Sequence, residues 1–168
     1  VAVGNPFGLG GTVTAGIVSA KGRPLGAAQA YTDFLQIDAP INRGNSGGPT
    51  FDLNGDVVGV NSAIFSPSGG NVGIGFAIPS DLAARIVDQL VEAGAVSRGY
   101  LGVAPQTLTA ELSEGLGLDP ETEGVLLSNV INGTPAQDAG LEQGDVVIEV
   151  DGEPVEDARD LTRRIGAY

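Results

Sequence analysis

The 168-residue sequence contains no cysteine, histidine, methionine or tryptophan, and only 5% of its residues are aromatic. Without cysteine, neither a disulfide nor a thiolate metal site can form, but exported proteins need not carry disulfides, so the compartment stays open. Without histidine, the commonest general base of enzymes is missing. The 27 glycines and 10 prolines are typical of a turn-rich β protein filled by Val, Ile, Leu and Ala.

Long apolar runs are also lacking, and no signal or transit peptide is recognisable. We therefore expect no membrane insertion by this segment and no targeting sequence in it. Its first residues, Val1-Ala2-Val3, look like the middle of a strand, so we expect the true N-terminus to lie upstream. The hydrophobic content of 42% is enough for a core, and the length allows one large domain or two small ones.

Basic residues are few, with 8 Lys and Arg against 21 Asp and Glu, for a net charge of −13. Residues 1–97 carry a net charge of −3 and residues 98–168 a net charge of −10, so the second part holds most of the excess. Such a surface repels phosphate backbones and anionic lipid, and we expect neither nucleic acid nor a membrane surface as a partner. Solubility is a sufficient explanation of the acidity.

One hexapeptide, Gly44-Asn45-Ser46-Gly47-Gly48-Pro49, combines a hydroxyl group with flexible backbone amides. Its three glycines permit positive φ angles and let N–H groups converge on a point that can hold an oxyanion. Acyl transfer needs this combination, an attacking oxygen with donors for the charge that develops on the substrate. A tight turn whose serine bonds its own backbone is the alternative, and the hexapeptide alone does not decide.

The same residues also fit the G-x-S-x-G nucleophile elbow, which runs from a strand into a helix. Here the serine is followed by residues 49–53, an Asn54-Gly55 turn and residues 56–60, the pattern of a β-hairpin. This context excludes the elbow. A serine on a loop before an antiparallel hairpin is instead the arrangement of chymotrypsin-like double β-barrels.

The remaining pattern of the first part predicts a small closed β-barrel with one helix. The glycine-rich loop 5–11 matches no phosphate-binding motif and is interpreted as a turn, while residues 25–32 have no assignment. Ser80 is the expected N-cap of an amphipathic helix that ends at Gly94. Residues 72–78 alternate large and small side chains, as a strand beside a pocket does. The six predicted strands are residues 1–4, 12–20, 34–38, 49–53, 56–65 and 72–78.

The second part predicts short strands at residues 100–103 and 124–130 and a strand between turns at 144–152. A short helix opens at Pro135 and ends at Gly140, and residues 157–165 show helical spacing.

Three motifs in order resemble the HtrA/Deg family of trypsin-like serine proteases: Gly4-Asn5-Pro6-Phe7-Gly8, residues 41–49 and residues 73–79. The second part resembles that family's PDZ domain through Tyr100-Leu101-Gly102-Val103, Thr134-Pro135-Ala136 and Gly144-Asp145. The resemblance covers nearly the whole chain. It implies a mainly β fold, with a chymotrypsin-like six-stranded C-terminal barrel and its C-terminal helix at residues 1–94 and a linker at 95–99. A partial α+β PDZ domain, truncated before its last strands, would occupy residues 100–168.

The resemblance also implies the site residues. Ser46 would be the nucleophile, with the backbone amides of Gly44, Asn45 and Ser46 as the oxyanion hole. Ile41, Ser62, Ala63 and Ile64 would shape a pocket for a small aliphatic side chain. Tyr100, Leu101, Gly102 and Val103 would bind the carboxylate of a peptide C-terminus, the peptide adding as a strand beside the helix at 157–165. No cofactor and no metal are expected.

The function implied is that of a serine endopeptidase of protein quality control, which degrades unfolded polypeptides and binds peptide C-termini. It implies a trimer-based homo-oligomer in the periplasm or cell envelope of a bacterium. Family members carry the catalytic His and Asp in a first barrel, and this chain has no His. We therefore predict that the chain as given is inactive, because loss of a triad costs about 10⁶ in rate. The second hypothesis is a non-catalytic peptide-binding module on an inert barrel scaffold.

Overall fold

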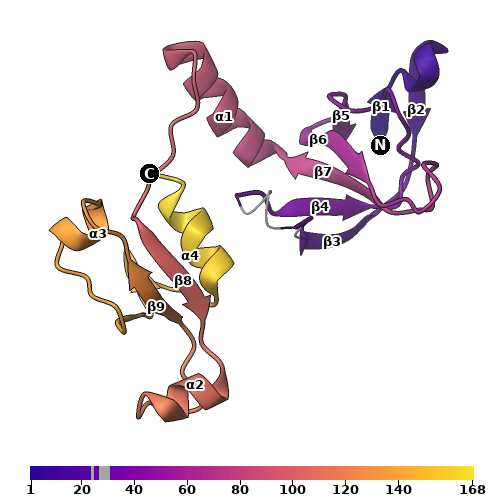
Figure 1. The fold of residues 1–168 in the computed structure, drawn as a ribbon. Coiled ribbons are helices and arrows are strands. Elements are labelled where there is room, and N and C mark those ends of the chain that lie inside the picture. The colour runs from indigo at the N-terminus through magenta and orange to yellow at the C-terminus, as the bar shows by residue number, and fades with distance from the viewer. Residues whose placement is uncertain (24, 27–30) are drawn as a thin grey trace. The chain divides into compact units, whose positions relative to one another are not determined.

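A computed structural model describes residues 1–23, 25–26 and 31–168 (Figure 1). The chain divides into two compact units, here called the first unit (Val1–Val96) and the second unit (Ser97–Tyr168). Their boundary lies within the expected linker at 95–99. The fold is mainly β with a few helices, as predicted. Within the described ranges, no helix has both the length and the apolar character needed to cross a bilayer.

The first unit is built on one antiparallel sheet with the strand order β2-β1-β5-β6-β7-β4-β3. The outermost strands, β2 and β3, are consecutive along the chain. Residues 12–20, predicted as one strand, are divided between them at Gly16, where an added Cβ would collide with Asp38 and the backbone of Ala39. This division turns six predicted strands into seven. The strands are β1 (Ala2–Gly4), β2 (Thr12–Thr14), β3 (Val18–Arg23), β4 (Phe34–Ile37), β5 (Pro49–Phe51), β6 (Val57–Ile64) and β7 (Gly75–Pro79).

The predicted hairpin joins β5 to β6 through Asn54-Gly55, and the φ of Gly55 is +89°. One short 3₁₀ turn, η1 (Pro6–Gly8), follows β1, and the helix α1 (Ser80–Ala93) follows β7. Gly94 ends α1 in the left-handed conformation, as predicted. The N-cap prediction is wrong by one residue, because β7 runs directly into the helix, Pro79 is the cap and Ser80 already lies in the first turn.

The apolar core of the first unit includes Ala2, Ile37, Ala39 and Ile41, with Ile64 packed against them. Phe34 and Phe76 add an edge-to-face ring pair at 6.3 Å.

The second unit combines a sheet of order β10-β9-β8 with three short helices. Its core contains Val125, Leu127, Val155 and Leu161, all buried. The strand predicted at 100–103 begins only at Val103, because Gly102 has a φ of +85° and lies against Thr134. The elements are β8 (Val103–Thr107), α2 (Ala110–Gly115), β9 (Val125–Val130), α3 (Pro135–Asp138), β10 (Val146–Val147), β11 (Glu149–Val150), β12 (Glu153–Pro154) and α4 (Ala158–Ile165).

Candidate functional site

Ser46 lies on the loop that connects β4 to β5, and its side chain is exposed. The segment continues into β5 and the hairpin rather than into a helix, so the structure agrees with the sequence in excluding a nucleophile elbow. The Ser46 hydroxyl donates a hydrogen bond of 2.9 Å to the carbonyl oxygen of Ser62 on β6. This contact brings the predicted nucleophile next to the predicted pocket.

The backbone amides of the serine loop, residues 42–50, fall into two groups. The N–H of Asn45 donates to Asn42 O at 3.0 Å, and the N–H of Gly47 donates to Asn61 O at 2.8 Å. In the described part of the chain, no group accepts a hydrogen bond from the N–H of Gly44 or of Ser46. Of the three donors expected for an oxyanion, Gly44 and Ser46 are therefore available, and Asn45 is already used within its own turn.

Gly44 occupies a position that only glycine fits. Its φ is +103°, and a Cβ there would collide with the carbonyl oxygen of Asn5. Asn5 N–H donates to Gly44 O at 3.2 Å and Phe7 N–H donates to Arg43 O at 3.0 Å. The first motif of the sequence, residues 4–8, thus lies directly against the serine loop and supports the peptide that precedes Asn45.

Of the predicted pocket residues, Ile41 is the most buried, with a side chain that is 1% exposed. Ile64 of β6 packs against the cluster that contains Ile41. Gly75 pairs with Ile64, and a Cβ on Gly75 would lie 3.0 Å from Ile41 Cγ1. Ser62 and Ala63 are the neighbouring residues of β6, half-buried. The glycine at position 75 lets β7 pack closely against Ile41 and Ile37, which fill the space that a side chain would occupy.

Two asparagines that sequence reasoning missed hold this loop. Asn71 donates from its side-chain Nδ2 to Ile41 O at 3.1 Å, and its N–H donates to Asn42 Oδ1 at 3.2 Å. Asn61, 1% exposed, lies under the other end of the loop. For Asn61 the signal in the sequence was an asparagine within a largely apolar strand, which is costly unless its amide is bonded. Asn71 lies on the loop between β6 and β7 and gave no such signal.

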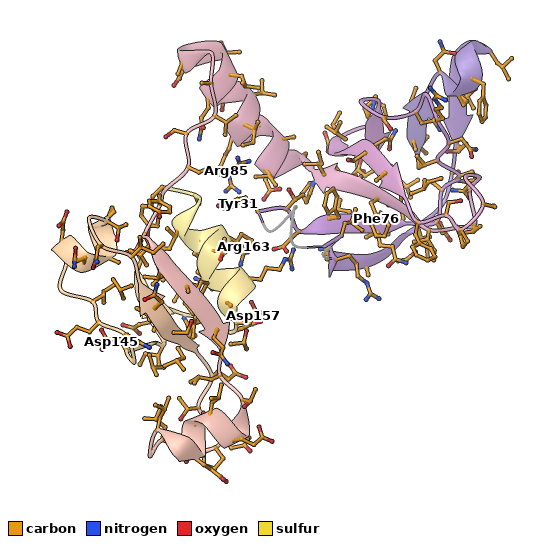
Figure 2. The ribbon with its side chains drawn as sticks, viewed as in Figure 1. Tyr31, Phe76, Arg85, Asp145, Asp157 and Arg163 are labelled. Carbon is orange, nitrogen blue, oxygen red and sulfur yellow. The ribbon has the colours of Figure 1, made fainter. Side chains whose placement is uncertain are left out.

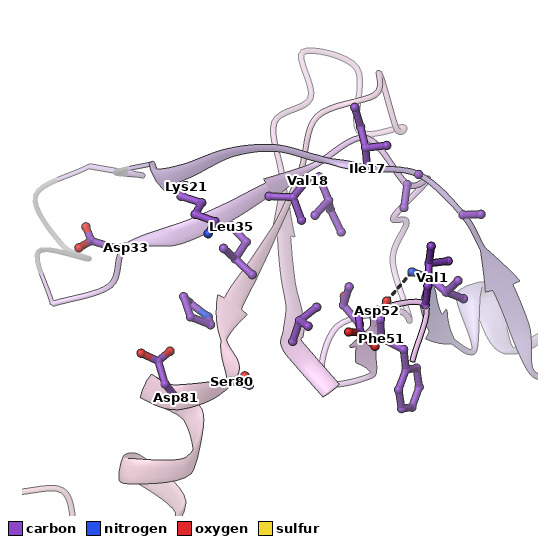
Figure 3. A pocket seen from close by; sticks show the side chains of 18 of the residues that line it. Val1, Ile17, Val18, Lys21, Asp33, Leu35, Phe51, Asp52, Ser80 and Asp81 are labelled. Atoms are coloured by element: carbon purple, nitrogen blue, oxygen red, sulfur yellow. Dashed lines mark hydrogen bonds between the residues drawn. The ribbon is translucent and has the colours of Figure 1, made fainter. Parts of the chain in front are cut away.

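A cavity of about 790 Å³ lies elsewhere in the first unit, and none of the predicted site residues lines it. Figure 3 shows Val18, Leu35 and Phe51 among its walls. Its lining is mainly apolar.

The second unit presents the other predicted site, at residues 100–103. The carbonyl oxygens of Leu101 and Gly102 accept hydrogen bonds of 2.9 Å from Ala136 and Ile131. No described group accepts a hydrogen bond from the N–H of Leu101 or Gly102. The loop therefore has its carbonyls anchored and two amides available, directly before β8, which is an edge strand of its sheet.

Helix α4 lies beside β8, and Ala158 N–H donates to Thr107 Oγ1 at 3.1 Å. Asp157, labelled in Figure 2 at the start of α4, caps the helix by accepting from Asp160 N–H at 2.7 Å. Burial raises the pKa of Asp160, but hydrogen bonds from Arg164, Glu156 N–H and Arg163 outweigh it and hold that pKa below its usual value. The helix is thus fixed by charge at its first turns, while Leu161 anchors it in the core.

Two family models match the chain, a trypsin-like peptidase domain at residues 1–60 and a PDZ domain at residues 99–167. The probable periplasmic serine endoprotease DegP-like of Bartonella henselae is 62% identical over 165 residues, 98% of this chain and 32% of that protein. The protein of the same name from Rhizobium meliloti is 60% identical over 167 residues, 99% of this chain and 33% of that protein. The chain thus spans about a third of the length of these relatives.

Two solved structures of an HtrA-type protease, AlgW, are similar over 98% of this chain. The structure with a tripeptide has a TM-score of 0.86 at 48% identity, over 55% of its own chain. The structure with a decapeptide has a TM-score of 0.84 at 48% identity, over 50% of its own chain. Both family models and these relatives agree with the fold, and the chain belongs to the HtrA/Deg family of trypsin-like serine proteases.

Proposed function

We propose that Ser46 is the nucleophile of a serine endopeptidase. The observation that carries this proposal is the exposed Ser46 hydroxyl on a loop where the N–H groups of Gly44 and Ser46 have no described acceptor. Attack by Oγ on a peptide carbonyl carbon forms a C–O bond and moves negative charge to the carbonyl oxygen, which these two amides can bind. The half-buried Ser62, Ala63 and Ile64 of β6, next to the carbonyl that Ser46 contacts, are proposed to receive a small aliphatic side chain of the substrate.

The reaction also needs a base, since the Ser46 proton must leave as the bond forms. This chain has no histidine, and Ser46 now donates to a carbonyl oxygen, which is not a base for an alcohol. We therefore assign the activity to a longer protein that supplies the base, and we propose that the 168-residue chain alone is inactive. A periplasmic location is proposed for this protein and is supported by the names of the relatives. Unfolded polypeptides as substrates and a trimer-based assembly are proposed from the family resemblance alone.

The second unit is proposed to bind peptide C-termini through the amides of Leu101 and Gly102, with the peptide pairing along the open edge of β8 beside α4. Tyr100 and Val103 flank these amides and complete the proposed peptide-binding loop. This activity needs no group from outside the chain. A non-catalytic peptide-binding module is therefore the second candidate function, and the absence of histidine is the observation that favours it.

A serine-directed phosphonate probe separates the two candidates. In the full-length protein we expect labelling at Ser46 and cleavage of an unfolded polypeptide, both abolished by Ser46→Ala and unchanged by Ser68→Ala, a change at an exposed turn serine. In the 168-residue chain we expect neither labelling nor cleavage, but binding of a peptide with a free C-terminus. Full-length protein that binds the peptide and is never labelled would leave only the binding module.

A further inference from the structure

We propose that Asn61 is a positioning residue for the nucleophile, and that its buried amide holds the serine loop in the arrangement that acyl transfer requires. The inference rests on the proposed function and adds to it a residue that does not touch the substrate. Asn61 is on β6, is 1% exposed, and immediately precedes Ser62, whose carbonyl oxygen accepts the hydrogen bond of Ser46.

The backbone of Asn61 holds the loop just after the serine. Its carbonyl oxygen accepts from Gly47 N–H at 2.8 Å, and its N–H donates to Gly48 O at 2.8 Å. These two bonds are the first contacts of the chain with β6 after Ser46. They orient the backbone that carries the Ser46 amide.

The side chain of Asn61 fixes the same segment a second time. Its Oδ1 accepts from Thr50 Oγ1 at 2.6 Å, and its Nδ2 donates to Pro49 O at 3.5 Å and to Val3 O at 3.1 Å. Val3 belongs to β1, on the other side of the loop. One side chain therefore ties the end of the serine loop to two strands.

An amide is the group that this site demands. It must accept from a hydroxyl and donate to two carbonyls from a short side chain, and an asparagine has both capacities. Every group that Asn61 contacts by a hydrogen bond is uncharged. An aspartate has the same shape, but as a carboxylate it can only accept, and it would face two carbonyl oxygens without a proton to share. Burial raises the pKa of such a carboxylate, and protonation restores one donor.

The test uses Asn61→Asp in the full-length protein, with labelling by the phosphonate probe measured at saturating concentration. At pH 8 we expect the maximal labelling rate to fall about 100-fold, the loss typical of a reacting group displaced by about 1 Å, with little change in the apparent affinity for the probe. The ratio of the variant's rate to that of the wild type should rise as the pH is lowered to 6. Thr50→Val, which removes one neutral hydrogen bond of about 1 kcal/mol, should slow labelling about fivefold at all pH values.

Two controls separate positioning from stability. Asn54→Asp changes the same residue type in the exposed hairpin turn and should leave the rate unchanged. Phe34→Leu removes buried volume in the same unit without touching the serine loop, and should lower the melting temperature without slowing labelling. Should Asn61→Asp fail to fold, Thr50→Val carries the test.

The possible outcomes are distinct. Labelling of Asn61→Asp at the wild-type rate overturns the inference. It is also overturned if the labelling rate of Asn61→Asp falls by the same factor at all pH values and Phe34→Leu, at equal stability, shows the same fall. An unlabelled wild type overturns the proposed function itself, and this inference with it.

Discussion

The two units of this chain are held in different ways. In the first unit, the buried residues at the end of the serine loop include two polar side chains that bond to each other, Thr50 of the loop and Asn61 of β6. The core of the second unit is a cluster of branched aliphatic residues around Leu161, ringed by further partly buried apolar side chains. The serine loop is thus fixed by the hydrogen bonds of a buried amide side chain. In the second unit, β8 and β9 pack on an aliphatic core, and the loop before β8 is held by hydrogen bonds from the N–H groups of Ile131 and Ala136.

The difference follows from what each proposed site must offer. An oxyanion site needs particular N–H groups without an acceptor while the neighbouring N–H groups are hydrogen-bonded. Hydrogen bonds are directional, so they can occupy one amide and leave the next one free. The peptide-binding edge needs the free amides of Leu101 and Gly102 at one end, but along β8 it offers a repeated backbone pattern, which requires only that packing hold the strand in place. Changes at the serine loop should therefore affect chemistry before stability, and changes in the second unit the reverse.

The largest effect is expected from Gly44→Ala in the full-length protein. The new Cβ would meet the carbonyl oxygen of Asn5, and displacement of the Gly44 amide should slow phosphonate labelling by about 10²–10³, the cost of losing one oxyanion donor. Gly55→Ala is the matched control, since Gly55 also has a positive φ, +89°, but open space around the added Cβ. Equal losses in the two variants would contradict the role given to Gly44.

Leu161→Ala should destabilise the second unit by about 3 kcal/mol, because it leaves a cavity at a fully buried position. Hydrogen exchange should show lost protection within residues 97–168 and retained protection in residues 1–96. Leu118→Ala, at a side chain that is 38% exposed, should change little. Lost protection in both units after Leu161→Ala would show that they do not differ as described.

Asp157→Ala removes the cap of α4, and we expect a loss of about 1 kcal/mol in the stability of the second unit. Chemical denaturation measures this loss of stability. Peptide binding by the folded variant is measured separately and should weaken as α4 frays. Asp138→Ala, in the short helix α3 and without a capping bond of its own, serves as the comparison. Equal effects from both aspartates would argue against the cap.

The smallest expected effect is on the stability of the second unit at acid pH. The pKa of Asp160 is lowered in the folded state, so its carboxylate contributes stability above the unfolded value of about 3.8, and this contribution is lost as the pH falls through the lower folded value. Asp160→Asn should reduce the stability of the second unit at pH 7 and flatten its decline below about pH 4. In the first unit, the pKa of Asp52 is lowered chiefly by a hydrogen bond from the Asp56 N–H, so Asp52→Asn should likewise flatten the decline of stability at acid pH.

Much of the fold was readable from local pattern. The Asn54-Gly55 turn, the end of α1 at Gly94 and the serine loop before a hairpin each depend on neighbouring residues, and the structure has them as predicted. Errors arose where a distant residue decides the local structure. The strand at residues 12–20 breaks because Gly16 faces Asp38, and the loop at 100–102 stays out of β8 because Gly102 faces Thr134.

The sequence by itself determined the order of motifs, the lack of a histidine base and the hydroxyl at position 46, since these are matters of residue identity. Only the tertiary structure decided which amides of the loop are free and that Asn61 and Asn71 hold it. A hydrogen bond between residues far apart in the chain leaves no periodic trace in the sequence, because its partner is chosen by the folding of the sheet.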